Sequence, residues 1–475
     1  MSEYQNGNSN GHSNGNGHSN GHGHIPTPVH LIGSGLKSAT RSGTSAVRKI
    51  FYIGLGVKRW LLAGSIGIAV CSIGLAFVLK NILSLALPDV LPWYLEGVIL
   101  GLFGVALILA AIYGLYRSVG PLLFASKSID VLADTLYTRR SRGRGARIVA
   151  IGGGTGLSVL LRGLKAYSDN ISAIVTVADD GGSSGRLRRE LGVLPPGDFR
   201  NCLVALSDDE TLLRELFQYR FSQGEGLEGH SFGNLFIAAM TNITGSFEQA
   251  LLESSRVLAV KGKILPATMA NLSLSAKMKD GSIIHGESRI GSSDGEIDRI
   301  MINPHDAEAH LAAVRAIEEA QLIVVGPGSL YTSVLPNLLV PEISKAMHNS
   351  RAKKVYVCNV ATQKGETFGY SVADHVEALQ SHTFPSIVDF VIANSRQHEL
   401  GKQFLGQPVS NDGRTLKHIR VVNSDLVDAV HPVRHDSVKL AQAIMDVYQG
   451  KHVDVASSRS AAKSAKTREL VEAKS

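Results

Sequence analysis

A run of glycines in the middle of the chain has the residue types and spacing to bind a phosphate group. Apolar residues 148–151 precede it and apolar residues at helical spacing follow it, which predicts a strand, a tight turn and a helix. The first N–H groups of such a helix lack partners within the helix, and with the helix dipole they attract anions. The ligand-binding residues predicted here are Gly152, Gly153, Gly154, Thr155 and Gly156.

The spacing of these glycines does not match the two best-known nucleotide-binding patterns. Leu157 stands where G-x-G-x-x-G has its third glycine, and no lysine follows as in a P-loop. NAD and ATP are therefore weak candidates. A glycine turn that only lets helix and strand pack closely is the alternative.

A second glycine turn follows the next apolar run, which ends at Asp179 and Asp180. Because loops at the carboxyl ends of parallel strands meet at one edge of a sheet, we expect both turns to face one ligand. Ser183 and Ser184 could donate to phosphate oxygens, and the two aspartates could bind sugar hydroxyls or hold Mg²⁺. The alternative for the aspartates is helix capping or a salt bridge to a nearby arginine.

Later segments repeat the pattern of a strand end followed by polar residues. A buried strand is predicted to end at Val325, before a Gly-Pro-Gly turn and a helix, and Arg434 precedes a predicted helix N-cap at Asp436. His230, which is also predicted to bind the ligand, could equally be a hydrogen-bonded structural residue. Arg434 could instead form a surface salt bridge. The further predicted ligand-binding residues are His230, Asn234, Gly326, Gly328, Ser329, Asn394, Ser395 and Arg434.

No catalytic pattern accompanies these turns. The sequence contains no Ser-His-Asp ordering, no H-E-x-x-H and no G-x-S-x-G, so no catalytic residue is assigned. Apart from Mg²⁺ at the aspartates, no metal or cofactor is predicted. These observations favour a binding protein over an enzyme.

Composition separates the 475 residues into several parts. Residues 1–45 are rich in Gly, Asn, Ser and His, which predicts a disordered tail; its histidines could bind a metal ion, but a plain low-complexity tail is favoured. The three cysteines are far apart, which argues against a disulfide framework. The net charge of +7 does not by itself indicate a nucleic-acid partner. Residues 146–450 are expected to form the main α/β domain, and residues 451–475 a flexible tail.

Two apolar stretches, about 60–79 and 97–116, have the length of membrane-spanning helices. They lie within residues 46–117, and a basic linker and a juxtamembrane helix are predicted over 118–145. Lysines and arginines flank the pair but are absent from its short connection, which places both termini and the main domain in the cytoplasm. The sequence thus predicts a two-helix transmembrane hairpin and a multi-pass protein of the cytoplasmic membrane.

Five segments resemble one known family. They are Gly152–Gly156, Asp179–Arg188 (DDGGSSGRLR), Pro195–Leu206 (PPGDFRNCLVAL), Gly229–Met240 (GHSFGNLFIAAM) and Gly326–Ile343 (GPGSLYTSVLPNLLVPEI). They resemble the YvcK branch of the CofD-like family, the gluconeogenesis factors, in register from about 146 to 449. The tail and the predicted hairpin lie outside this resemblance.

The resemblance implies a Rossmann-like, three-layer α/β domain with a mostly parallel sheet. It also implies a regulator that binds a UDP-sugar, UDP-N-acetylglucosamine, and links gluconeogenic growth to cell-wall synthesis and cell shape. Partners would then include cell-wall enzymes and a second copy of the chain. The alternatives are a CofD-type transferase, which moves a phospholactyl-like group from a nucleotide-activated donor, and a membrane scaffold that binds no nucleotide.

Overall fold

The computed structural model describes residues 57–82, 98, 101–114, 142–208, 211–396, 400–401 and 404–451. They belong to two compact units, residues 1–137 and 138–475, and each unit is described by itself. The predicted tail at 1–45, all but Lys451 of the predicted tail at 451–475, most of the connection between the two apolar stretches and the juxtamembrane helix at 118–137 lie outside the described residues.

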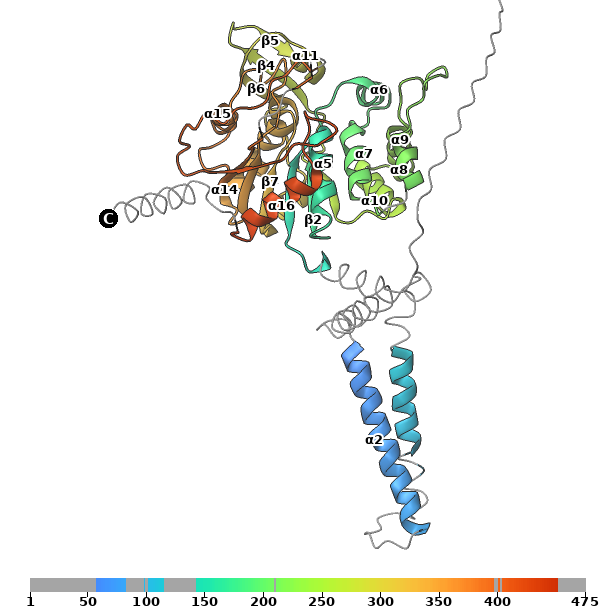
Figure 1. Cartoon of the computed structure of the whole chain (residues 1–475). Helices are drawn as coiled ribbons and strands as arrows, with labels where there is room; N and C mark the ends of the chain where they lie inside the picture. The colour runs from blue at the N-terminus through green and yellow to red at the C-terminus, as the bar shows by residue number, and fades with distance from the viewer. Residues whose placement is uncertain are drawn as a thin grey trace, which may run out of the picture. The chain divides into compact units, whose positions relative to one another are not determined.

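A seven-stranded parallel sheet forms the centre of the larger unit (Figure 1). Every pairing between its neighbours is parallel. Its order is β10-β9-β8-β7-β1-β2-β3. The strands are β1 (Ile148–Gly152), β2 (Ile171–Val175), β3 (Lys263–Pro266), β7 (Leu322–Val325), β8 (Lys353–Val357), β9 (Phe390–Asn394) and β10 (Arg420–Ser424).

The central strands are short, nearly continuous apolar runs, as expected where helices cover both faces of a parallel sheet. All residues of β1 and β7 are buried. The chain runs outward from β1 through β2 to β3, and then returns to β7 on the other side of β1. The strand order therefore reverses between β1 and β7, and open α/β sheets bind their ligands outside the strand ends at such a point.

Helices cover the two faces of the sheet. The helices of this unit are α5 (Gly154–Leu164), α6 (Gly182–Leu191), α7 (Gly197–Leu206), α8 (Thr211–Gln218), α9 (Phe232–Thr244), α10 (Phe247–Val257), α11 (Glu287–Gly291), α12 (Leu311–Glu319), the π-helix η1 (Leu330–Val334), α13 (Leu335–Leu338), α14 (Pro341–Asn349), α15 (Val372–His382) and α16 (Ser437–Tyr448). Helix α5 packs between α7 and α16, and α12 packs against α14. Helices α7 and α12 both contact β2 and β3 without packing on each other, so they lie on opposite faces. The domain is therefore a three-layer, Rossmann-like α/β fold, as predicted.

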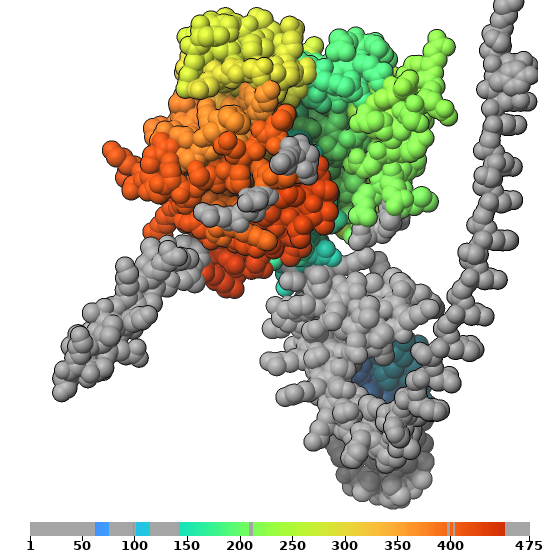
Figure 2. Space-filling view, turned by 45° about the horizontal axis from the view of Figure 1, so that its top comes forward, coloured from blue at the N-terminus to red at the C-terminus, as the bar shows by residue number. Residues whose placement is uncertain are grey.

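A small antiparallel sheet interrupts this plan between β3 and β7. Its order is β5-β4-β6, formed by β4 (Ser273–Met278), β5 (Ile283–His285) and β6 (Ile297–Asn303). We call residues 273–303, which include α11, the insert. Figure 2 shows it as a yellow lobe at the top of the domain, beside the green α6–α10 region. The sequence analysis did not predict this element.

The smaller unit contains two packed helical segments, α2 (Val57–Ile82) and residues 101–114. They approach closely at Gly67 and Gly104: a Cβ atom on Gly104 would lie 2.8 Å from the Cys71 nitrogen. Among the residues that the structure describes, no helix is long and apolar enough to cross a membrane. This finding overturns the predicted transmembrane hairpin and the predicted location in the cytoplasmic membrane.

The packing of α5 against α16 depends on a glycine. A Cβ atom on Gly163 would lie 2.0 Å from the Ser437 carbonyl oxygen and 2.8 Å from the Ala441 Cβ. We expect Gly163→Ala to push the helices apart and to lower the free energy of unfolding by about 1–3 kcal/mol. Urea unfolding followed by circular dichroism measures the change. The control is Gly143→Ala, because a Cβ atom at Gly143 meets nothing within 4 Å; equal stability of the two variants would contradict the prediction.

Candidate functional site

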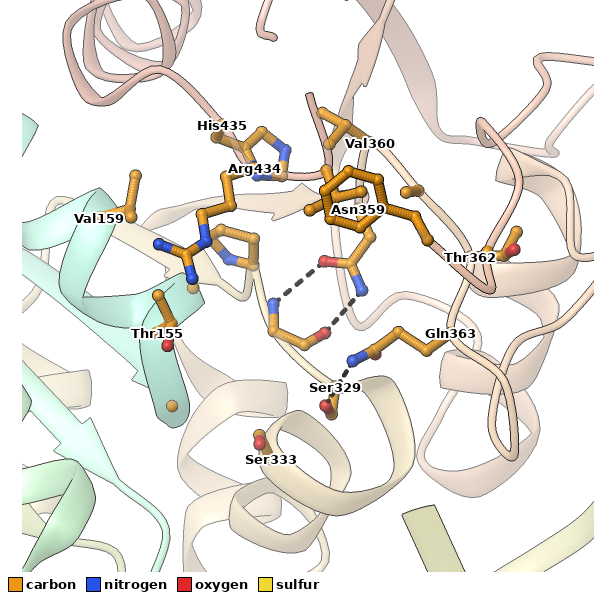
Figure 3. A pocket seen from close by; sticks show the side chains of 18 of the residues that line it. Thr155, Val159, Ser329, Ser333, Asn359, Val360, Thr362, Gln363, Arg434 and His435 are labelled. Carbon is orange, nitrogen blue, oxygen red and sulfur yellow. Dashed lines mark hydrogen bonds between the residues drawn. The ribbon is translucent and has the colours of Figure 1, made fainter. Parts of the chain in front are cut away.

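A cavity of about 460 Å³ lies where the strand order reverses (Figure 3). Its walls come from the loops that follow β1, β7 and β8, and from two segments after β9 and β10. Predicted ligand-binding residues that line it are Gly153, Gly154, Thr155, Gly156, Gly328, Ser329 and Arg434. The structure thus brings together the first glycine loop, the Gly326–Gly328 turn after β7 (the third turn) and Arg434, which precedes the last helix.

The loop after β1 is pressed against the turn after β7. A Cβ atom on Gly156 would lie 2.4 Å from the Pro327 carbonyl oxygen, so a larger residue would separate the two cavity walls. Gly153 is also crowded, because its Cβ would lie 2.6 Å from Asp198 Oδ2 and 2.7 Å from Thr176 Cγ2. These glycines therefore do allow close packing, which was the alternative to ligand binding. The same glycines also line the cavity, so the two interpretations do not exclude each other.

The turn after β7 is held by side chains from the loop after β8. The Asn359 side chain accepts a hydrogen bond from the Gly328 N–H (3.2 Å) and donates one to the Gly328 carbonyl oxygen (2.8 Å). The Gln363 amide donates to Ser329 Oγ (2.9 Å). Figure 3 shows these contacts on the floor of the cavity. They fix the backbone of one wall by means of residues that the sequence analysis did not single out.

The helix that follows this turn is already capped by an anion of the chain itself. Glu366 is buried, and its carboxylate accepts hydrogen bonds from the Tyr331 N–H (3.0 Å) and the Thr332 hydroxyl (2.9 Å). Burial raises the pKa of Glu366, and these two donors oppose that rise. The N-terminus of η1 is therefore occupied, so the turn Gly326–Gly328 offers a ligand no free helix end, and the N–H and carbonyl groups of Gly328 are engaged by Asn359.

The second glycine turn has two aspartates with different roles. The Asp180 carboxylate accepts hydrogen bonds from the backbone N–H groups of Glu287 (3.0 Å) and Ser288 (2.9 Å), so it caps α11 of the insert. Asp179 Oδ1 accepts from the Gly181 N–H (2.9 Å). Helix capping, the alternative considered for the aspartates, thus describes Asp180, although the capped helix is far away in the sequence.

The polar residues of α6 and α9 form a buried group of their own. Ser183 Oγ lies 2.9 Å from His230 Nδ1 and accepts a hydrogen bond from Asn234 Nδ2 (3.0 Å). Ser184 Oγ accepts from the Gly197 N–H (3.1 Å), which ties α6 to α7. Burial lowers the pKa of His230, and the nearby Arg186 lowers it further. These contacts match the structural interpretation of the histidine.

Ten predicted residues are not among those that line the cavity: Gly152, Asp179, Asp180, Ser183, Ser184, His230, Asn234, Gly326, Asn394 and Ser395. Asn394 instead accepts a hydrogen bond from the Leu426 N–H (3.2 Å) and donates to the Arg396 carbonyl oxygen (2.7 Å). Its side chain shapes the end of β9. A ligand-binding role for these ten residues stays a prediction.

Carboxylates gather between the first glycine loop and the insert. Burial raises the pKa of Asp198 to about 6, although the Gly154 N–H donates to it, and the neighbouring Asp179 raises it further. Burial also raises the pKa of Glu287 to about 8, together with repulsion from Asp179 and Asp180. In the part of the chain that the structure describes, no group of three or more His, Cys, Asp or Glu side chains is arranged to hold a metal ion. Because Asp180 is engaged by α11, the predicted Mg²⁺ pair of Asp179 and Asp180 gains no support.

Arg434 occupies the opposite wall from Gln363 (Figure 3). Among the described residues no carboxylate lies within salt-bridge distance of its guanidinium, although the charge of Arg434, after the N–H groups of His431 and Val430, helps to lower the pKa of Asp428. The adjacent His435 is buried, its Nε2 lies 3.1 Å from the Cys358 carbonyl oxygen, and burial lowers its pKa to about 4. Asp436 caps α16 through the N–H groups of Val438 and Lys439, as predicted, and this fixes the segment that carries the arginine.

Residues of the loop after β8 were missed, although a signal was present. The segment Lys353–Val357 forms strand β8, which is buried from Lys354 onward, and Asn359 follows soon after its end. The strand-end rule that found the first and third turns therefore applies to this loop as well. Lining residues that the sequence analysis did not name include Ser333, Asn359, Thr362, Gln363, Lys364 and Phe404.

Known proteins that are similar to this chain show its family. The model of the family described as 2-phospho-L-lactate transferase CofD matches residues 148–447. A Nostoc protein named "Putative gluconeogenesis factor" is 47% identical over 425 residues, which cover 84% of this chain and 92% of that protein. The gluconeogenesis factor of Bacillus subtilis is 49% identical, over 64% of this chain and 99% of its own length.

A solved structure is also similar. The crystal structure of a Bacillus halodurans protein, described as a member of the upf0052 family, has a TM-score of 0.60 and 47% sequence identity, and it covers 63% of this chain and 99% of that chain. The match extends over the α/β domain that contains the cavity. The chain therefore belongs to the CofD family, and within it to the group of proteins named gluconeogenesis factors.

Proposed function

We propose that this protein is a regulatory factor that binds a nucleotide sugar, UDP-N-acetylglucosamine, in the cavity at the strand-order reversal. The observation that carries the proposal is the pairing of the first glycine loop with Arg434 across one cavity. A diphosphate between them would accept hydrogen bonds from backbone N–H groups of the loop and from the guanidinium of Arg434. Both are donors that commonly bind phosphate oxygens.

The first turn of α5 supports this position for the diphosphate. Early N–H groups of a helix have no partner within it. That of Gly154 donates to Asp198, which leaves those of Thr155 and Gly156 for a ligand. The negative charge of Asp198 also makes the Gly154 side unfavourable for a phosphate. The diphosphate is therefore expected on the Thr155 side of the loop, toward Arg434.

The rest of the cavity suits the remainder of such a ligand. Its volume of about 460 Å³ is within the range of roughly 300–1,000 Å³ of small-molecule sites. Phe404 offers an apolar ring, and Thr362 and Gln363 offer polar groups on the wall opposite Arg434. These residue types suit a nucleobase and sugar hydroxyls.

Binding without turnover is the form of the proposal that the cavity favours. None of the residues that line it is an aspartate or a glutamate, and the buried His435 is held as a structural residue. A regulator of this kind would report the level of its ligand through different affinities of two conformations. The names of the relatives support a link to gluconeogenic growth. We extend the proposal to cell-wall synthesis and cell shape, with cell-wall enzymes and a second copy of the chain as partners.

The arginine gives the first test. Replacing Arg434 with methionine keeps much of the apolar stem but removes the charge-assisted hydrogen bonds. We expect the dissociation constant for UDP-N-acetylglucosamine to rise about tenfold to a hundredfold, measured by isothermal titration calorimetry on the full chain. Arg351→Met, at another exposed arginine that does not line the cavity, is the control. Unchanged affinity of the Arg434 variant would place the phosphates elsewhere.

The absence of turnover gives the second test. After long incubation with Mg²⁺ and candidate acceptors, the full chain is expected to return UDP-N-acetylglucosamine unchanged, as followed by chromatography. A product that forms with the parent protein and disappears in the Asp179→Asn variant would instead establish a transferase of the CofD type.

The carboxylates beside the loop give a third test, on stability. Because the folded pKa of Glu287 is raised above its usual 4.5 to about 8, the neutral form is favoured in the fold. Its contribution to stability is complete below the unfolded pKa and is lost as the pH rises through the folded one. We expect Glu287→Gln to raise the melting temperature at about pH 9 and to change it little at about pH 4. The exposed Glu308→Gln is the control; no pH dependence of the difference at Glu287 would contradict the prediction.

A further inference from the structure

We propose that Lys364 is a second cation for the anionic ligand, and that the empty protein holds it on Asp294 of the insert. Ligand binding would then draw Lys364 into the cavity and loosen the insert. This inference rests on the proposed function, because it assumes a phosphorylated ligand in the cavity.

Lys364 has the right position for both partners. It lines the cavity and follows Gln363, whose amide is fixed on Ser329 at the cavity floor. Figure 3 shows Gln363 across the cavity from Arg434. A diphosphate between these walls would therefore have one cation on each side once the Lys364 side chain leaves Asp294.

The ion pair that Lys364 makes in the empty protein is easily exchanged. Its Nζ lies 2.8 Å from Asp294 Oδ1, and the two side chains are 55% and 82% exposed. Exposed pairs of this kind contribute little, because water and salt screen them and two flexible side chains must be held. A diphosphate in a partly enclosed cavity carries more negative charge and is screened less. The lysine should therefore leave Asp294 when the ligand is present.

The loop that carries Lys364 touches the insert directly, so a change at Lys364 can be transmitted to the insert. A Cβ atom on the next residue, Gly365, would lie 2.6 Å from the Gly291 carbonyl oxygen and 2.9 Å from the Ser293 carbonyl oxygen. Helix α11 of the insert is thus bounded by Asp180 at its N-terminus and by the 364–365 loop just beyond its C-terminus. Release of the second contact would loosen the C-terminal side of α11, while the insert stays attached through Asp180 and through contacts such as the hydrogen bond from the Ile300 N–H to His382 Nε2.

Reciprocity makes this inference testable in a direction that damage to the fold would not produce. If Asp294 and the ligand compete for Lys364, removal of Asp294 must strengthen ligand binding. We expect Asp294→Asn to lower the dissociation constant for UDP-N-acetylglucosamine about two- to fivefold, and Lys364→Met to raise it about tenfold. In the double variant, the Asp294 substitution should have no further effect.

A second ion pair of the insert supplies matched controls. Lys279 Nζ lies 2.5 Å from Glu296 Oε2, and both side chains are exposed. Neither residue lines the cavity. Lys279→Met and Glu296→Gln are therefore expected to leave the affinity unchanged. Isothermal titration calorimetry on the full chain measures all five variants against the parent.

Hydrogen exchange follows the release of the insert. Ligand should speed amide exchange over residues 287–295 in the parent and have no such effect in the Lys364→Met variant. If the parent binds the ligand but Asp294→Asn binds no more tightly than Glu296→Gln, the competition is refuted while the proposed function stands. If the parent binds no UDP-sugar, the proposed function and this inference both fall.

Discussion

The contact between the glycine loop after β1 and the turn after β7 sets the geometry of the whole site. Gly156 lies against the carbonyl oxygen of Pro327, at the point where the strand order reverses. Elsewhere in a parallel sheet, neighbouring loops leave toward the same side. Here the following segments diverge to opposite sides of the sheet, and the space between them is the cavity. The side chains of Asn359 and Gln363 then hold the turn after β7 in place through hydrogen bonds to Gly328 and Ser329.

The chain satisfies several of its own helix ends with carboxylates, and this restricts where an anion can bind. Glu366 caps η1, Asp180 caps α11, and Asp198 accepts from the first N–H of α5. None of the three lies in the turn directly before the helix that it serves, and Asp198 belongs to the first turn of α7. A glycine-rich turn before a helix is therefore an incomplete indicator of a phosphate site, since the phosphate must compete with internal anions. Arg434 and the remaining donors of α5 lie where that competition is weakest.

The fold was predictable where a local pattern decides the structure. The buried strand ending at Val325, the helix capped by Asp436 and the parallel sheet all follow from apolar runs and turn residues. The predicted membrane hairpin was wrong, because it rested on apolar composition alone, and no described helix is both long and apolar enough to cross a membrane. The insert was missed because β4 and β6 mix exposed and buried residues, whereas the predicted strands were continuous apolar runs.

The site was predictable only in part, because side-chain direction depends on tertiary contacts. His230 and Asn234 follow a loop in the way that ligand-binding residues do, yet they turn toward Ser183 in the interior. Glu366 has no local motif, and although Asn359 follows a strand end, the partners of both side chains appear only when distant loops meet. The resemblance to known proteins identified the family, but it could not show which donors were already engaged.

The position of the insert in the chain has a consequence for the integrity of the molecule. The insert lies on the single connection that carries the chain from the β1-β2-β3 half of the sheet to the β7-β10 half. One polypeptide cut in its turn at Asp280–Ser282 would therefore leave two fragments, one with the glycine loop and the other with Arg434 and the loop after β8. The hydrogen bonds of β1 with β7 and of β4 with β5 and β6, together with helix packing such as that of α5 on α16, would then hold the two pieces together. Each fragment would contain half of the cavity, so that recovery of ligand binding by mixed fragments would amount to reassembly of the sheet.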